Sequence, residues 1–238
     1  MINEKAKWIW IHDEPKKNEY AIFEEQLSYR GECAVFSVCA ETDYILYVNG
    51  SVASFGQFAG YQFQKYYDEI NISSFLKDGN NAITLSVRYE GVNSSTHIDD
   101  GAGVIFSCTL DGELALYSSK DTPCGYDGRY VQNVQRVITT QLGLASDMCR
   151  RVGKADMRSV EINKTLNIQK RPVKKAEIQP FVCGRPLFEG SNIYDLGREE
   201  AGYLYLKTKS ATCANLRCFG ATIPPQGRAC GQPNLYVP

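Results

Sequence analysis

The fold is decided by a stretch that opens with Tyr44-Ile-Leu-Tyr-Val-Asn-Gly50 and closes with Ala82-Ile-Thr-Leu-Ser-Val-Arg-Tyr89. The first run is β-branched and aromatic, and it stops at Asn-Gly, the pair most typical of a two-residue hairpin turn. The second run alternates strictly between apolar and polar side chains. This period of two predicts an antiparallel strand with one face on a core and the other in water.

Between these runs, Phe75-Leu-Lys-Asp-Gly-Asn80 predicts one amphipathic turn, which closes where Gly79 can adopt a positive φ at no steric cost. Residues 51–65 are rich in Gly, Gln and aromatic side chains and fit no period. We expect them to form an ordered surface loop after the hairpin.

Further strands are expected on both sides of this stretch. Trp8-Ile-Trp10 predicts a short first strand, and Cys33–Ala40, which is apolar on both faces, predicts a central one. Asp111-Gly112 predicts a second hairpin between two alternating runs. No amphipathic helix of ten to fifteen residues is apparent, so the pattern favours an all-β protein.

Composition narrows the class of protein. A chain of 238 residues with 43% hydrophobic and 22% charged residues is typical of a soluble globular protein of one large or two small domains. A net charge of -1 gives no reason to expect nucleic acid or an anionic membrane as a partner. No signal-peptide pattern and no bilayer-spanning apolar run is present, and we expect a cytoplasmic protein. The nine cysteines, without a CxxC pair, predict reduced thiols.

The order Tyr-x-Leu-Tyr-Val-Asn-Gly, Tyr-Asp-x-Ile-x-Ile-Ser-x-Phe-Leu, Gly-Asn-Asn-x-Ile resembles the jelly-roll modules that precede the catalytic barrel of bacterial α-L-rhamnosidases. Looser versions occur in sugar-binding domains of β-galactosidases. The resemblance covers most of residues 8–118 and, in patches, 166–228, where Ala221 stands in place of a usual Glu. It implies an all-β fold with a jelly-roll, galactose-binding-like β-sandwich over residues 1–145. An irregular segment and linker over 146–185 and the start of a second β-sandwich over 186–238 would follow.

The resemblance implies that the complete enzyme hydrolyses terminal α-L-rhamnosides with inversion, using carboxylates from a helical barrel that is normally in the same chain. That barrel has no counterpart in this sequence, so we expect a truncated gene product or an excised portion that is not catalytic alone. Two other interpretations stay open. The chain is either a stand-alone carbohydrate-binding module or a purely structural spacer.

The aromatic loop is the main candidate for a binding site. Aromatic faces stack on the C–H faces of sugars and polar side chains meet their hydroxyls, so we predict substrate-binding roles for Asn49, Tyr61, Tyr66 and Asp68. The structural alternative is that the tyrosines at the end of the loop begin a strand and pack beneath it, while Phe63 pins the loop down.

Other groups carry weaker signals. The acidic pairs Glu24-Glu25, Asp99-Asp100 and Glu199-Glu200 are expected on solvated surface, since adjacent side chains of a strand point to opposite faces. His97 with Asp99 and Asp100 is compatible with Ca²⁺, but the same residues suit a turn without metal. We therefore expect no catalytic residue, no metal and no cofactor in this chain.

Overall fold

The computed structural model describes residues 1–95, 97–149, 151, 153–164, 167–175, 184–191, 193–197, 220–222 and 230–232. The chain divides into two compact units, Met1–Lys174 and Lys175–Pro238. In the described residues the structure is all-β, as predicted, and its one helical element is a 3-10 turn, η1 (Ser73–Phe75). No helix in this part of the chain is long and apolar enough to cross a membrane.

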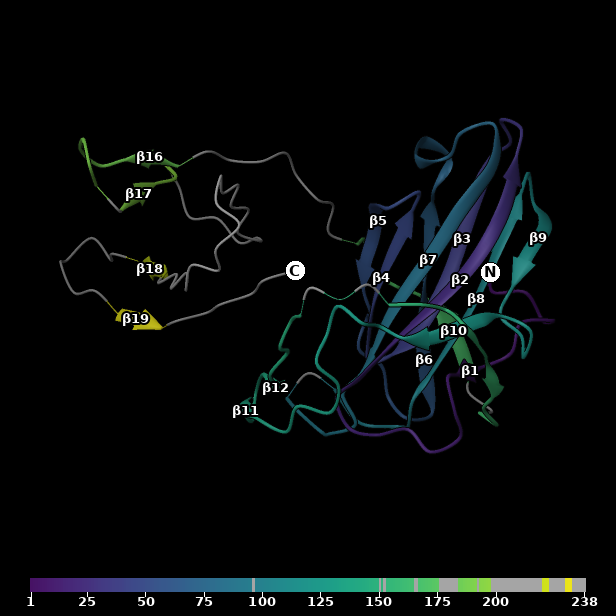
Figure 1. Ribbon diagram of the computed structural model, residues 1–238, viewed down its shortest axis with the longest axis horizontal. Coiled ribbons are helices and arrows are strands. Elements are labelled where there is room, and N and C mark those ends of the chain that lie inside the picture. Colours follow the sequence, from purple (N-terminus) through teal and green to yellow (C-terminus); the bar gives the residue numbers. More distant parts are fainter. Residues whose placement is uncertain are drawn as a thin grey trace. The chain divides into compact units, whose positions relative to one another are not determined.

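The first unit contains a seven-stranded sheet with the order β14-β1-β8-β3-β6-β15, in which β9 also pairs with β8 (Figure 1). All pairs are antiparallel except β15 with β6, which is parallel. The strands are β1 (Ile9–Trp10), β3 (Ala34–Glu41), β6 (Gln64–Asn71), β8 (Gly103–Leu110), β9 (Glu113–Tyr117), β14 (Val160–Glu161) and β15 (Asn167–Lys170).

The second sheet of this unit has six antiparallel strands in the order β13-β10-β2-β7-β4-β5. They are β2 (Glu19–Tyr29), β4 (Asp43–Val48), β5 (Ser51–Gly56), β7 (Gly79–Tyr89), β10 (Pro123–Tyr126) and β13 (Met157–Arg158). One core joins the two sheets, because buried residues of both belong to the same cluster. The architecture is therefore the predicted β-sandwich.

The predicted hairpin is confirmed. Asn49 and Gly50 have φ values of 51° and 80° and connect β4 to β5, as a type I′ turn requires. The expectation of a surface loop over residues 51–65 is wrong at both ends, because residues 51–56 form β5 and residues 64–65 belong to β6. A register shift opposite Leu46 and Tyr47 interrupts the pairing, which explains why no period of two is visible in this edge strand.

The core is rich in aromatic side chains. Trp10 packs against Phe23 at 6.0 Å, and Phe36 stacks on Phe106 at 5.5 Å between ring centroids. The prediction of a central strand is confirmed, since Phe36 of β3 lies in the main core while Cys39 on its other face lies in a second apolar cluster with Trp8. Five cysteines of the first unit are free thiols: Cys33, Cys39, Cys108, Cys124 and Cys149.

The polar face of β7 is covered at Ser86 and Arg88, where its alternation predicted water, whereas Ala82 at the other end of this face is exposed as predicted. Ser86 is 4% exposed and donates to a carboxylate oxygen of Asp127 at 2.6 Å. Arg88 donates to the carbonyl oxygen of Leu144 at 2.7 Å. Residues 127–145 therefore cross this face and cover it with hydrogen-bonding groups, a contact that a local pattern cannot indicate.

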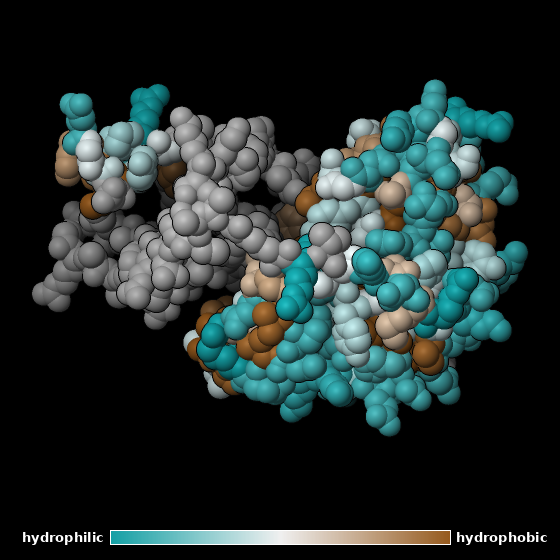
Figure 2. Space-filling model, in the orientation of Figure 1, coloured by the Kyte–Doolittle hydropathy of each residue, from teal (hydrophilic) through white to brown (hydrophobic). Residues whose placement is uncertain are grey.

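Part of this covering segment is a small hairpin of β11 (Val137–Thr139) and β12 (Gly143–Leu144). It stands off from the sandwich in Figure 1, and apolar side chains gather over it in Figure 2. Val137 and Ile138 are 60% and 52% exposed. The hairpin thus presents an apolar surface to its surroundings.

The segment 146–185, expected to be irregular and a linker, supplies strands β13, β14 and β15 to the edges of both sheets. The sequence did not predict these edge strands, because a strand of two to four residues is too short to show an alternating pattern. In the second unit, β16 (Arg185–Pro186) pairs with β17 (Tyr194–Asp195), and β18 (Gly220–Thr222) with β19 (Cys230–Gln232). A second sandwich there stays a prediction, and Glu199-Glu200 lies outside the described residues.

Candidate functional site

An exposed aromatic pair stands on the loop between β5 and β6. Tyr61 and Phe63 are 59% and 72% exposed, and their rings are parallel with centroids 5.2 Å apart. The backbone amide of Gln64 donates to the carbonyl oxygen of Tyr61 at 3.2 Å. A β-carbon on Gly60 would lie 2.6 Å from the carbonyl oxygen of Gln64, so the chain folds back where only glycine fits. This tight turn holds both rings in solvent.

Polar side chains fix the loop to its neighbours. Gln57 accepts from the backbone amide of Ala40 at 2.9 Å and donates to the carbonyl oxygen of Tyr66 at 2.7 Å. Gln62 donates to the carbonyl oxygen of Asp99 at 2.9 Å, which joins this loop to the one between β7 and β8. The aromatic pair therefore sits on an anchored platform, which lowers the entropy cost of binding a ligand.

A largely buried group of four charges lies next to the loop. The ammonium of Lys65 is 2.5 Å from a carboxylate oxygen of Glu41, and both side chains are less than 5% exposed. Lys65 and Lys164 are each 3.9 Å from the same oxygen of Asp100, and Lys164 donates to the carbonyl oxygen of Gly101 at 2.6 Å. Two acids and two lysines balance, as burial of charge requires.

Burial also sets the protonation of this group. It raises the pKa of the Glu41 carboxyl, an effect that Lys65 opposes. The ring of His97 lies 3.8 Å from Glu41 and 3.4 Å from the hydroxyl of Thr42. Burial, reinforced by Lys65, lowers the pKa of His97 to about 4, so its imidazole is neutral at pH 7.

Two of the four predicted binding residues lie together. Tyr61 is on the exposed loop, and Tyr66 is the third residue of the following strand β6, where its hydroxyl accepts from Gln64 at 2.6 Å. Part of the structural alternative also holds, because Tyr67 is only 5% exposed. Its other part fails, since Phe63 points into solvent instead of pinning the loop.

The other two predicted residues serve the fold. Asp68 is 3% exposed, accepts a hydrogen bond from Tyr44 and lies 2.6 Å from the guanidinium of Arg171. Asn49 lies at the opposite end of the β4–β5 hairpin from Tyr61. Its side chain donates to Asn81 at 2.8 Å and accepts from the backbone amide of Ala82 at 3.1 Å, which ties the turn to β7.

Of the four charged residues next to the loop, sequence reasoning singled out only Asp100, and it expected a solvated side chain where the structure has one that is 23% exposed. Glu41, Lys65, Asp100 and Lys164 come from four separate segments and share no motif, so only the tertiary fold brings them together. Asp99 behaves as the turn alternative predicts, because its carboxylate accepts from the backbone amide of Gly101 at 3.3 Å. No group of three metal-ligating side chains occurs among the residues that the structure describes.

Comparison with known proteins places the fold. No protein-family model and no curated protein matches the sequence. Among solved structures, the chain is similar to the GH78 family rhamnosidase of Bacillus sp. GL1, with a TM-score of 0.65 and 20% identity over 72% of this chain and 20% of that one. It is also similar to the α-L-rhamnosidase of Dictyoglumus thermophilum, with a TM-score of 0.53 and 15% identity over 71% of this chain and 22% of that one.

This chain has the fold of a part of the α-L-rhamnosidases. The resemblance seen in the sequence is thereby confirmed at the level of fold. The chain spans about a fifth of the length of these rhamnosidases.

Proposed function

We propose that this chain is the non-catalytic β-sandwich portion of an α-L-rhamnosidase-like glycoside hydrolase and that it holds carbohydrate on the Tyr61–Phe63 loop. The observation that carries this proposal is the pair of parallel, exposed rings on an anchored turn. Sugars place their C–H faces on aromatic rings, and the side chain of Gln62, which stands between the two rings in the sequence, supplies a polar group. The complete enzyme would hydrolyse terminal α-L-rhamnosides with inversion.

The state of the acids next to the loop supports a non-catalytic role. A glycosidase needs one protonated and one ionised carboxyl group on opposite sides of the sugar bond. Glu41 is held by Lys65 and buried, and Asp100 lies between Lys65 and Lys164. Both acids therefore already have lysine partners within the protein.

The binding proposal is tested by calorimetric titration of the full chain with L-rhamnose and, separately, with D-galactose. We expect a Kd in the millimolar range for one of them, weakened at least about tenfold in Tyr61→Ala and in Phe63→Ala because each removes one ring of the platform. Tyr117→Ala is the matched control, since it removes a tyrosine that is 38% exposed on β9. The absence of saturable heat, or an equal loss in the control, contradicts the proposal.

The non-catalytic role is tested with nitrophenyl α-L-rhamnoside. We expect no release of nitrophenol above the rate without protein. Turnover of about 1 s⁻¹ or more, typical of enzymes, contradicts this part of the proposal.

A structural spacer is the second candidate, and the exposed β11–β12 hairpin favours it. Val137 and Ile138 would then be covered by another part of the enzyme. This role is favoured if neither sugar binds while Ile138→Ser leaves the fold unchanged and increases the solubility of the isolated chain.

A further inference from the structure

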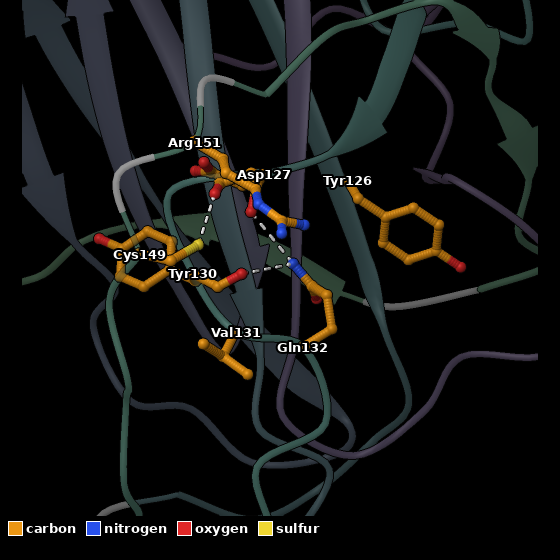
Figure 3. A pocket seen from close by; sticks show the side chains of 8 residues that line it. Tyr126, Asp127, Tyr130, Val131, Gln132, Cys149 and Arg151 are labelled. Atoms are coloured by element: carbon orange, nitrogen blue, oxygen red, sulfur yellow. Dashed lines mark hydrogen bonds between the residues drawn. The ribbon is translucent and has the colours of Figure 1, made fainter.

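A pocket of about 430 Å³ lies beside β10, and no residue of the Tyr61–Phe63 loop lines it (Figure 3). Its walls include Tyr126, Tyr130, Val131 and Arg151. The volume falls in the range of small-molecule sites, roughly 300–1,000 Å³. It is therefore large enough for a single sugar ring.

One side of the pocket is a strap, defined as the described residues 147–149, 151 and 153–155. Two backbone hydrogen bonds hold it, from Val131 to the carbonyl oxygen of Asp147 and from Cys149 to that of Arg129, each 2.8 Å long. The thiol of Cys149 also donates to the carbonyl oxygen of Gly128 at 2.9 Å, a contact drawn in Figure 3. Further along, a β-carbon on Gly153 would lie 2.8 Å from the amide nitrogen of Gly128. The strap is thus pressed closely against the turn after β10.

The polar floor of the pocket has its hydrogen bonds satisfied within the protein. The buried carboxylate of Asp127 accepts from Ser86 at 2.6 Å and from two guanidinium nitrogens of Arg129 at 2.9 and 2.7 Å. Gln132 accepts from the backbone amide of Tyr20 at 2.8 Å and donates to the carbonyl oxygen of Asp127 at 3.1 Å. The floor is rigid, and its one negative charge is cancelled by Arg129.

The positive charge of Arg151 is separate from the Asp127–Arg129 pair. Its side chain is exposed, and no acid of the described residues lies within ion-pair distance of it. Figure 3 shows its guanidinium, in this view, between Tyr126 on one side and Tyr130 on the other. One face of Tyr130 is stacked on Tyr20 at 4.2 Å, whereas the ring of Tyr126 is 43% exposed. The pocket thus combines an open aromatic face with a guanidinium.

We propose that this pocket is a second binding site and that it takes an acidic monosaccharide of the hexuronate class. The planar guanidinium of Arg151 matches a carboxylate with two parallel hydrogen bonds. The ring of Tyr126 offers a surface for the C–H face of the sugar, and Val131 borders the pocket with apolar surface. A neutral sugar would satisfy the aromatic face but not the guanidinium.

The test compares two ligands that differ only in the group at C6. The full chain is titrated with sodium D-glucuronate and with D-glucose at constant ionic strength, and binding is followed by calorimetry and by NMR. We expect saturable binding of glucuronate at millimolar concentration and binding of glucose at least about tenfold weaker. Arg151→Gln should weaken glucuronate binding at least about tenfold, and Tyr126→Ala should weaken it as well.

Lys154→Gln is the matched control, because it removes the same charge from the strap at an exposed residue outside the pocket lining. We expect it to change the Kd less than about twofold. Tyr61→Ala should leave glucuronate binding intact, which separates this site from the proposed rhamnoside site. Thermal unfolding of each variant verifies that it is folded.

Four results would overturn the proposal. These are no saturable binding of glucuronate, equal binding of glucose, and an effect of Lys154→Gln as large as that of Arg151→Gln. The fourth is displacement of glucuronate by an equal concentration of inorganic phosphate, which would indicate a site for anions in general.

Discussion

On one face of β7, Leu85 and Val87 lie in the core between the two sheets, whereas on the other face Ser86 and Arg88 lie beneath residues 127–145. Both pairs of residues are covered, but by different physical means. The apolar face is stabilised by the removal of hydrocarbon from water, which needs no particular partner. The polar face needs a matching donor or acceptor for every buried group. A substitution on the apolar face should therefore destabilise the protein by removing buried hydrocarbon, whereas one on the polar face should do so by leaving buried groups without hydrogen-bond partners.

The largest effect is expected on the apolar face. Leu85 is 2% exposed, and Leu85→Ala should lower the free energy of unfolding by about 2–5 kcal/mol through lost burial and the cavity left behind. Urea unfolding monitored by circular dichroism measures this. Thr84→Ala, a half-buried neighbour on the other face, is the control and should cost much less. Equal costs would mean that the two faces do not differ as described.

The next effect concerns the polar face. Asp127→Ala leaves Ser86 and Arg129 without their shared acceptor, which should cost about 1–3 kcal/mol and expose the segment over β7. Hydrogen exchange of residues 127–149 and urea unfolding report the two consequences. The control is Asp147→Ala, since its pair with Arg136 is exposed and should contribute at most about 1 kcal/mol. An unchanged exchange rate in Asp127→Ala would show that the segment is held by other contacts.

A smaller effect should follow from pH. The pKa of His97 is about 4 in the folded protein against an ordinary value of 6.5, so the unfolded chain binds more protons in between. His97 therefore contributes stability that is present above pH 6.5 and is lost as the pH falls towards 4. The comparison of urea unfolding between the native chain and His97→Gln isolates this contribution from that of Glu41, whose raised pKa acts in the opposite sense. Parallel pH profiles would contradict the assignment.

The smallest effect on stability is expected at the aromatic pair. Phe63 is 72% exposed, so Phe63→Ala should change the free energy of unfolding by less than about 0.5 kcal/mol although it weakens sugar binding. Thermal unfolding of this variant, with Phe36→Ala in the core as a contrast, measures the difference. A loss comparable to that of Phe36→Ala would mean that the ring supports the fold.

Features that depend on a few adjacent residues were predictable. The hairpin at Asn49-Gly50 follows from two residues that tolerate positive φ, and Asp111-Gly112, with φ values of 48° and 88°, repeats the device. The buried face of β7 follows from its period of two. The binding residues stay a prediction, but Asp68 and Asn49, whose side chains are suited to sugars, have partners within the fold. Residue type alone does not reveal which polar groups are already paired.

The sequence by itself determined that this protein is built of strands, where two of its hairpins turn and which side of β7 faces the core. These properties depend on backbone dihedrals and on alternation within a few residues. Only the tertiary structure decided that β13, β14 and β15 form edges of the two sheets. It also brought together charges of opposite sign from four separate segments around Lys65, and it placed the strap along the pocket beside β10. Each of these depends on contacts between residues far apart in the chain, and such contacts leave no local period to detect.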